Sequence, residues 1–214
     1  MFRCEDPTEF GTHVDSLLCK YCGEAKMCPL SRKHYSAVTW VCHGCGSRQS
    51  RAEVALSSKI LDSTWNSLLK CTASPLRKQM LMLDKLKPNF GDQHYYVMEV
   101  KRRIIELIGG KDHPYDKVEE DLLKLKVQYC EDHLDLISVL SPGLSESSGW
   151  MSLHLAEALV CCVERGLDDI QEKKTIIEDN LERVVQIFGP YRTDSYEREK
   201  AEHAKVLMKR VKKL

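Results

Sequence analysis

A repeated cysteine pair near the N-terminus is the feature that most constrains this chain. Cys19/Cys22 and Cys42/Cys45 form a C-x2-C, x19, C-x2-C array, and a glycine follows the second cysteine of each pair. A two-residue gap lets one tight turn aim both sulfur atoms at a single ion, and glycine suits the positive φ that such a turn needs. The spacing predicts one structural Zn²⁺ ion held by these four cysteines.

The expected cellular setting supports metal binding over disulfide bonding. No secretory signal is visible after Met1, and the longest apolar run, 158–163, is too short to span a membrane. We therefore expect a chain of the cytoplasm, the nucleus or both, without a membrane partner, where thiols stay reduced. A redox dithiol is the competing interpretation of either pair, but it would need a βαβ setting that the pattern lacks.

The segment around the cysteine pairs predicts a zinc ribbon. Residues 37–41 are β-branched and aromatic and lead into the second pair, as a short strand would. Four thiolates close the coordination sphere and leave no open position for water, so the site is structural rather than hydrolytic. Cys28, His34 and His43 are further ligand types nearby. We expect Cys28 to be a small buried side chain and both histidines to be exposed.

Charge gives no simple argument for a polyanionic partner. The chain has 214 residues with 32 Lys+Arg and 32 Asp+Glu, so its formal net charge is zero. Its content of 43% hydrophobic residues excludes a wholly disordered chain. A nucleic-acid-binding ribbon remains an alternative. It would bind through the basic residues near the C-terminus, Lys209, Arg210, Lys212 and Lys213. The same residues are explained equally well as the solvated end of a helix, where the helix dipole favours positive charge.

From Arg51 onward, apolar residues recur at helical spacing and glycine or proline separates the stretches. We treat these apolar residues, and His133 among them, as core. The predicted stripes are Val54, Leu61, Trp65 and Leu68; Val97, Val100, Ile104 and Ile108; Val118, Leu122, Leu125, Tyr129, Leu136 and Leu140; Met151, Leu155, Ala158 and Cys162; Ile170, Ile177, Leu181, Val184 and Phe188; and Ala204, Leu207, Val211 and Leu214.

Short connections between these helices predict antiparallel neighbours. The fold class is therefore mostly α, an antiparallel helical-hairpin array of the tetratricopeptide-like type at 51–214, preceded by a small Cys4 zinc ribbon with short β-strands at 19–50.

The residues from Arg3 to Thr12 read R-C-E-D-P-T-E-F-G-T. This run resembles the end of the post-SET segment of the SET-and-MYND-domain (SMYD) protein-lysine methyltransferases, in a branch where C-x2-C and W-x-C-x2-C elements follow. Here Trp40 precedes the second cysteine pair in that pattern. Looser landmarks of the family's helical C-terminal domain are Lys87-Pro88-Asn89, Pro142-Gly143-Leu144-Ser145 and Gly149. The resemblance makes 1–18 the end of a post-SET segment.

The same resemblance implies that catalytic parts lie elsewhere. Cys4 matches the third cysteine of the family's C-x-C-x2-C motif, and the SET elements and MYND finger are not in these residues. We expect the chain to correspond to the C-terminal part of such a protein, and we assign it no catalytic or cofactor-binding residue.

Two functional expectations follow from the resemblance. The first is a non-catalytic zinc-binding and helical module that recruits protein partners, with histone or other lysine substrates only in an intact parent enzyme. The alternative is a piece of an active S-adenosylmethionine-dependent lysine methyltransferase whose SET domain lies upstream.

Overall fold

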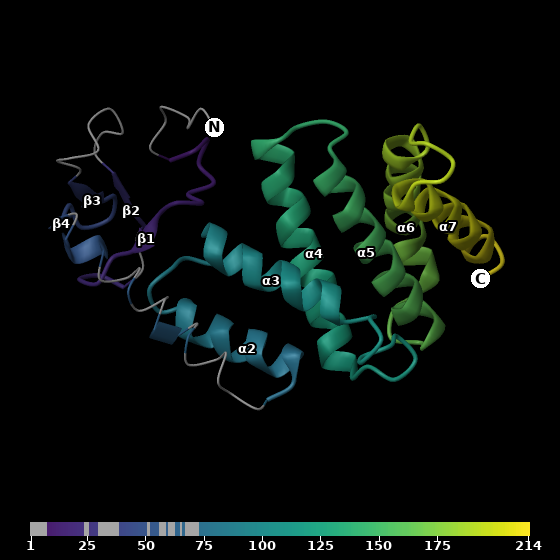
Figure 1. Cartoon of the computed structure of the whole chain (residues 1–214), viewed down its shortest axis with the longest axis horizontal. Helices are drawn as coiled ribbons and strands as arrows, with labels where there is room; N and C mark the ends of the chain where they lie inside the picture. The colour runs from purple at the N-terminus through teal and green to yellow at the C-terminus, as the bar shows by residue number, and fades with distance from the viewer. Residues whose placement is uncertain are drawn as a thin grey trace. The chain divides into compact units, whose positions relative to one another are not determined.

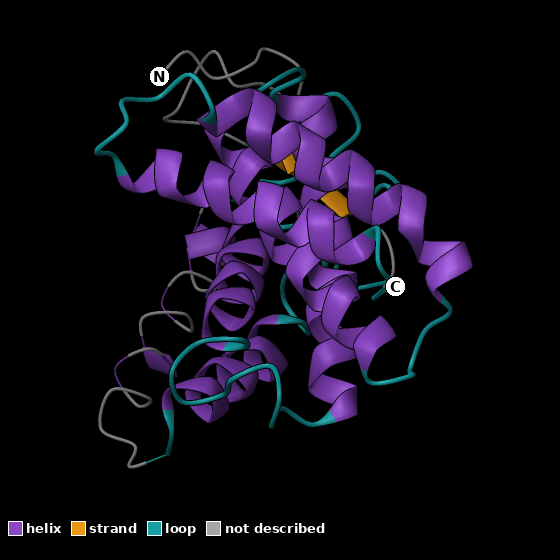
Figure 2. Cartoon of the chain, turned by 90° about the vertical axis from the view of Figure 1, so that its right-hand side faces the viewer, coloured by secondary structure: helices purple, strands orange, loops and turns teal. Residues whose placement is uncertain are grey.

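The computed structural model describes residues 8–23, 26–29, 39–50, 52–55, 59, 63–64, 66 and 73–214. The chain divides into two compact units, Met1–Arg103 and Ile104–Leu214. Helices dominate the described part, and strands are confined to one small region (Figure 1, Figure 2). This confirms the predicted fold class, a mostly helical chain with a small antiparallel sheet near its N-terminus. The domain boundary at residue 51 stays a prediction.

The sheet of the first unit is a four-stranded antiparallel meander in the order β1-β2-β3-β4. Met27 pairs with Cys42, and Cys28 pairs with Val41, so the pairing of β2 with β3 includes the first cysteine of the second pair. Strands of two to four residues cannot bury a core of their own. Their bounds are Leu17–Leu18 for β1, Lys26–Pro29 for β2, Trp40–Cys42 for β3 and Arg48–Gln49 for β4.

Two backbone contacts attach this sheet to helices of the same unit. The amide of Leu18 donates to the carbonyl of Asn89 at 3.1 Å, and the amide of Tyr95 donates to the carbonyl of Val14 at 2.8 Å. Residues 14–18 therefore lie along the connection between α2 (Pro75–Leu86) and α3 (Tyr95–Leu107). Hydrogen bonds to the α2–α3 connection therefore stabilise the ribbon in addition to the pairing of its own short strands.

Helix boundaries follow the predicted breaks in the chain. Glycine or proline lies between every pair of helices from α2 onward, and the helix ends flank those residues. In the second unit α4 packs on α5, α5 on α6, and α6 on α7, as antiparallel hairpins (Figure 1). Their bounds are Glu120–Leu140 for α4, Glu146–Glu164 for α5, Ile170–Phe188 for α6 and Tyr196–Val211 for α7.

The helix α5 is the centre of the second unit, because it contacts α4, α6 and α7. Its sequence is apolar on nearly every face, which is the pattern of a helix buried on all sides. The predicted stripe from Met151 to Cys162 is buried throughout. Gly149 lets the helix approach α6 closely, since a Cβ atom there would lie 2.8 Å from Cζ of Phe188.

The buried face of α4 includes the predicted Tyr129 and His133 but departs from the predicted stripe at its leucines, since Leu136 is half-buried and Leu140 is exposed. Leu122 and Leu125 are only half-buried, whereas Leu123 and Lys126 are almost fully buried. A lysine can take an interior position here because its ammonium group finds a backbone carbonyl, that of Ile108, at 2.6 Å. Apolar spacing alone does not reveal such a contact.

The other stripes differ in how much of them the structure describes. The stripes of α3 and α6 are buried except for a half-buried Ile170, and that of α7 is buried up to Val211, while Leu214 is exposed. Most of the first stripe, including Trp65, lies outside the described residues. Among the described residues, we find no helix with the length and hydropathy to cross a membrane.

Candidate metal centre

Two tight turns of the ribbon carry the four predicted cysteines. Cys19 and Cys22 follow β1, whereas Cys42 ends β3 and Cys45 lies in the turn before β4. In each turn the amide of the glycine after the second cysteine donates to the carbonyl of the first, at 2.7 Å and 3.0 Å. Those glycines have φ of +75° and +70°, which confirms the backbone conformation predicted from their position.

The four sulfur atoms lie within 4.8 Å of one another. Across the turns, Cys19 Sγ is 3.7 Å from Cys45 Sγ, and Cys22 Sγ is 3.7 Å from Cys42 Sγ. Four ligands at the usual Zn–S distance in a tetrahedron are separated by about 3.8 Å, so this spacing fits zinc. A disulfide would need about 2.05 Å, and all four are free cysteines.

Several hydrogen bonds favour thiolates at this site. The amides of Gly44 and Cys45 point at Cys42 Sγ, at 3.3 Å and 3.4 Å. The hydroxyl oxygen of Ser47 lies 3.2 Å from Cys19 Sγ and 3.1 Å from Cys45 Sγ. Burial opposes ionisation of Cys19, but hydrogen bonds from Ser47 and nearby backbone amides outweigh it and lower the pKa of Cys19 to about 6. Contacts with the side chain and the backbone amide of Ser47 lower the pKa of Cys45.

The pKa of Cys42 shifts in the opposite direction. The amide of Cys45 favours its thiolate, yet burial and the neighbouring sulfur atoms of Cys45 and Cys19 raise the pKa of Cys42 to about 11. Four thiolates at this spacing repel one another, so they coexist only around a cation that compensates their charge. The donor set is therefore suited to a divalent metal and poorly suited to four free anions.

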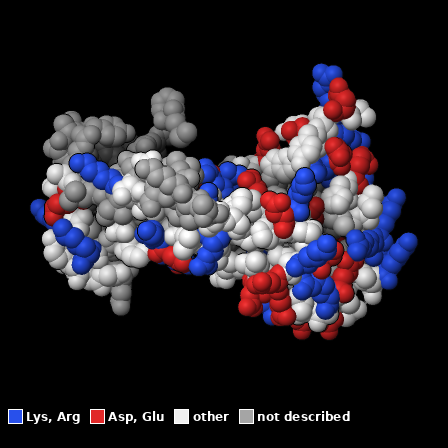
Figure 3. All heavy atoms as spheres, turned by 60° about the horizontal axis from the view of Figure 1, so that its bottom comes forward, with Lys and Arg blue, Asp and Glu red and all other residues white. Residues whose placement is uncertain are grey.

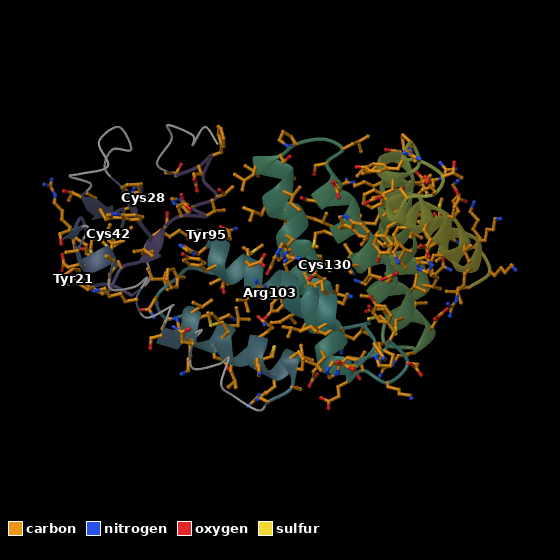
Figure 4. The ribbon with its side chains drawn as sticks, in the orientation of Figure 1. Tyr21, Cys28, Cys42, Tyr95, Arg103 and Cys130 are labelled. Carbon is orange, nitrogen blue, oxygen red and sulfur yellow. The ribbon has the colours of Figure 1, made fainter. Side chains whose placement is uncertain are left out.

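The other ligand types near the ribbon lie outside the sulfur cluster. Cys28 is 2% exposed, with its Sγ 3.0 Å from Ser16 Oγ and 3.3 Å from His13 Nδ1, and His43 is exposed, both as expected. Figure 4 shows Cys28 beside Cys42 in the ribbon. Cys130, Cys161 and Cys162 are buried in the helical unit. Cys4, His34 and Cys71 lie outside the described residues.

Lys20, in the first cysteine turn, forms an ion pair with Glu53. Lys20 Nζ lies 2.7 Å from Glu53 Oε1, and the other Glu53 oxygen accepts from the amide and hydroxyl of Ser50. The Lys20 ammonium and these donors lower the pKa of Glu53 to about 2. This ion pair connects the first cysteine turn to the helical residues 52–55.

Sequence reasoning missed Ser47 and the Ser16–His13–Cys28 contacts. Ser47 directly follows the second turn's glycine, and that position is the only signal that could have suggested it. The contacts around Cys28 join residues 12 and 15 positions apart, which no local motif predicts. No family model and no curated protein matches this chain. The functional argument therefore depends on the geometry of the four sulfur atoms.

Proposed function

We propose that this chain is a non-catalytic module that combines a structural zinc ribbon with a helical protein-interaction domain. The observation that supports the proposal best is the convergence of four cysteine sulfur atoms from two turns within 4.8 Å. Cys19, Cys22, Cys42 and Cys45 would hold one Zn²⁺, and four protein ligands would leave no position for a substrate or an activated water.

The role of the metal follows from the size of the ribbon. Its strands have two to four residues, and among the ribbon residues that the structure describes a few apolar side chains such as Met27 are buried. When bound, Zn²⁺ supplies an apparent free energy of about 10–16 kcal/mol in comparable peptides, which replaces the missing core. The cysteine turns, whose conformation depends on their glycines, contribute by holding the four sulfur atoms close together.

The helical unit supports the second half of the proposal. Antiparallel hairpins present long helix faces, and some large apolar side chains stay exposed, among them Leu144 at 63% and Val206 at 62%. Positive and negative side chains are interspersed over the face drawn in Figure 3. An array with mixed charge and scattered apolar side chains suits a protein partner better than a polyanion.

The family resemblance adds a specific context to this proposal. The module would correspond to the C-terminal part of a SMYD-type lysine methyltransferase, and its partners would include proteins that carry lysine substrates. In that context S-adenosylmethionine would bind to SET residues, not to these 214 residues.

The zinc half is tested by cobalt substitution of the purified chain. Co²⁺ bound by four thiolates in a tetrahedron gives an intense visible absorption with a sulfur charge-transfer band. We expect one equivalent to saturate this spectrum and zinc to displace it. Cys19→Ser should weaken the charge-transfer band, whereas Cys130→Ser, a buried cysteine of α4, should leave it unchanged. An octahedral spectrum would contradict the proposal.

The non-catalytic half is tested by calorimetric titration with S-adenosylmethionine. We expect no saturable heat from the zinc-loaded chain. Saturable binding would place a donor site within these residues and would favour the methyltransferase alternative.

A further inference from the structure

Two sulfur contacts of the metal centre run from one cysteine turn to the other. Cys19 Sγ lies 3.7 Å from Cys45 Sγ, and Cys22 Sγ lies 3.7 Å from Cys42 Sγ. The partners are 26 and 20 positions apart in the sequence, so each contact joins the first turn to the second. The other combinations of these sulfur atoms also lie within 4.8 Å. Each sulfur atom therefore has neighbours close enough to form a disulfide.

Each of the two contacts pairs an exposed cysteine with a buried one. Cys45 and Cys22 are exposed, whereas their respective neighbours Cys19 and Cys42 are buried. An oxidant in solvent therefore reaches one member of each pair, and the buried member lies where it can react with the oxidised sulfur. Redox-sensitive cysteines have this arrangement, in which an accessible thiolate lies beside a second cysteine that completes the disulfide.

Disulfides within the turns are the alternative, between Cys19 and Cys22 and between Cys42 and Cys45. Such bonds would close loops of a few residues and would leave the two turns unconnected. Disulfides across the turns close much longer loops, which removes more conformational freedom from the unfolded chain. They also connect the same two turns that the zinc ion would connect. Both arguments favour pairing across the turns.

We propose that peroxide converts the zinc site of this module into two disulfides, Cys19–Cys45 and Cys22–Cys42. This inference rests on the proposed zinc site and adds a metal-free, cross-linked state to it. The backbone hydrogen bonds between β2 and β3, and between β1 and the α2–α3 connection, do not use the sulfur atoms. Oxidation therefore releases the metal while these contacts of the ribbon persist.

The oxidant is hydrogen peroxide, and the chemistry is the same in both pairs. Cys45 Sγ attacks one peroxide oxygen, the O–O bond breaks, and the departing hydroxide is protonated to water. Cys19 Sγ then attacks the sulfur of this sulfenic acid, so the S–S bond forms, the S–O bond breaks and a second hydroxide leaves as water. Two thiolates are oxidised and one peroxide molecule is reduced. Both reactions together remove all four thiolates, which are the metal-binding form of cysteine.

Disulfide mapping of the zinc-loaded full chain after treatment with hydrogen peroxide provides the test. Remaining thiols are blocked, the chain is digested with trypsin without reductant, and released zinc is followed with a chromogenic chelator. Cleavage after lysine and arginine separates the cysteines, since peptides 4–20, 21–26 and 34–48 carry Cys19, Cys22 and the second cysteine pair. We expect one species that joins all three peptides, and the loss of one zinc ion for every two peroxide molecules consumed.

The alternative pairing gives a different digest. Disulfides within the turns would join the first two of these peptides and leave an internal bridge in the third. Fragmentation of the linked peptides assigns the partners and also tells Cys19 from Cys4, which lies in the same peptide. Pairing within the turns, pairing of Cys19 with Cys42, or oxidation that forms no disulfide would overturn the inference, as would a chain that keeps its zinc and its thiols.

Single substitutions check the pairing independently. In Cys45→Ser we expect the Cys22–Cys42 disulfide to form and Cys19 to remain outside any disulfide, whereas pairing within the turns would join Cys19 to Cys22. Cys28→Ser is the matched control, since Cys28 is a buried cysteine of β2 outside the cluster, and it should give the digest of the parent. The map of the parent chain decides the question even if Cys45→Ser does not fold.

The zinc content measured before oxidation keeps the two proposals apart. A chain that holds one zinc ion but forms other disulfides, or none, contradicts the inference alone. A folded chain that holds no zinc after reconstitution contradicts the proposed function itself.

Discussion

The ammonium group of Lys126 donates a hydrogen bond of 2.6 Å to the backbone carbonyl of Ile108 inside the helical unit. Lys126 is 1% exposed, and its Nζ also lies 4.9 Å from the centre of the Tyr115 ring. The Tyr115 hydroxyl in turn donates to Glu157, whose second oxygen lies 3.0 Å from His203. A line of polar contacts thus runs from the interior of α4 through α5 to the half-exposed surface of α7.

The burial of Lys126 predicts a pH dependence of stability. Desolvation lowers the pKa of Lys126 to about 8, below the 10.5 expected in the unfolded chain. The unfolded chain therefore binds more protons between these values, so this group's contribution to the free energy of unfolding rises with pH there. Lys126→Met removes the effect, and we expect the stability of the variant relative to the parent to fall by about 2–3 kcal/mol from pH 7 to pH 10.

Chemical denaturation at the two pH values measures this difference. Lys124→Met is the control, since Lys124 is exposed and paired with Glu120 on the surface of the same helix. The prediction is wrong if the difference in the free energy of unfolding between Lys126→Met and the parent does not change with pH. That result would show that Lys126 is not buried as an ammonium ion.

Gly149 makes a second prediction, at the crossing of α5 and α6. A Cβ atom there would lie 2.8 Å from Cζ of Phe188 and 3.2 Å from Cγ2 of Ile187. Alanine is the better helix former by about 1 kcal/mol, but overlap in a packed interface costs about 1–3 kcal/mol. We expect Gly149→Ala to lower the free energy of unfolding by about 1 kcal/mol, measured by thermal or urea denaturation.

Two further variants test that explanation. Ser147→Ala, at an exposed position of the same helix, should leave stability unchanged or slightly higher. Phe188→Leu shortens the opposing side chain, so Gly149→Ala should cost less in that background. Additive effects of the two substitutions would argue against the contact.

Gly46 provides a prediction for the second cysteine turn. Its φ of +70° is costly for residues with a Cβ atom, by roughly 1–2 kcal/mol. Because the turn must adopt this conformation to bring Cys42 and Cys45 together, Gly46→Ala should weaken zinc affinity by about tenfold. Competition with a chelator of known affinity measures it. Gly44, which lacks a positive φ, is the comparison, and an equal loss in Gly44→Ala would contradict this explanation.

Local chemistry explains what could be predicted from the sequence. The four cysteines were identified because two short turns restrict where their sulfur atoms can point, and Gly23 and Gly46 adopt the conformation that this requires. Most helix ends were predictable because proline lacks a backbone N–H group and glycine readily adopts the conformations that end a helix, although Gly149 lies inside α5. Burial of the α5 stripe followed from the apolar character of that segment.

Contacts between distant residues explain what could not be predicted. The position of Lys126 in the interior depends on the carbonyl of Ile108 and the ring of Tyr115, so a lysine is buried in α4 where Leu122 and Leu125 are only half-buried. Nothing in the sequence distinguishes Ser47 from the other serines, because its contacts with Cys19 and Cys45 arise only when the sheet forms. The SMYD resemblance stays a prediction, because no structural feature tests it.

Native mass spectrometry of the purified, folded chain tests the central claim most directly. We expect one Zn²⁺ per chain, removed by a strong chelator or by acidification that protonates the thiolates, and lost in Cys19→Ser. Cys161→Ser, a change at a buried cysteine of α5, should retain the ion. A folded chain that carries no metal after purification and reconstitution with zinc would contradict the account.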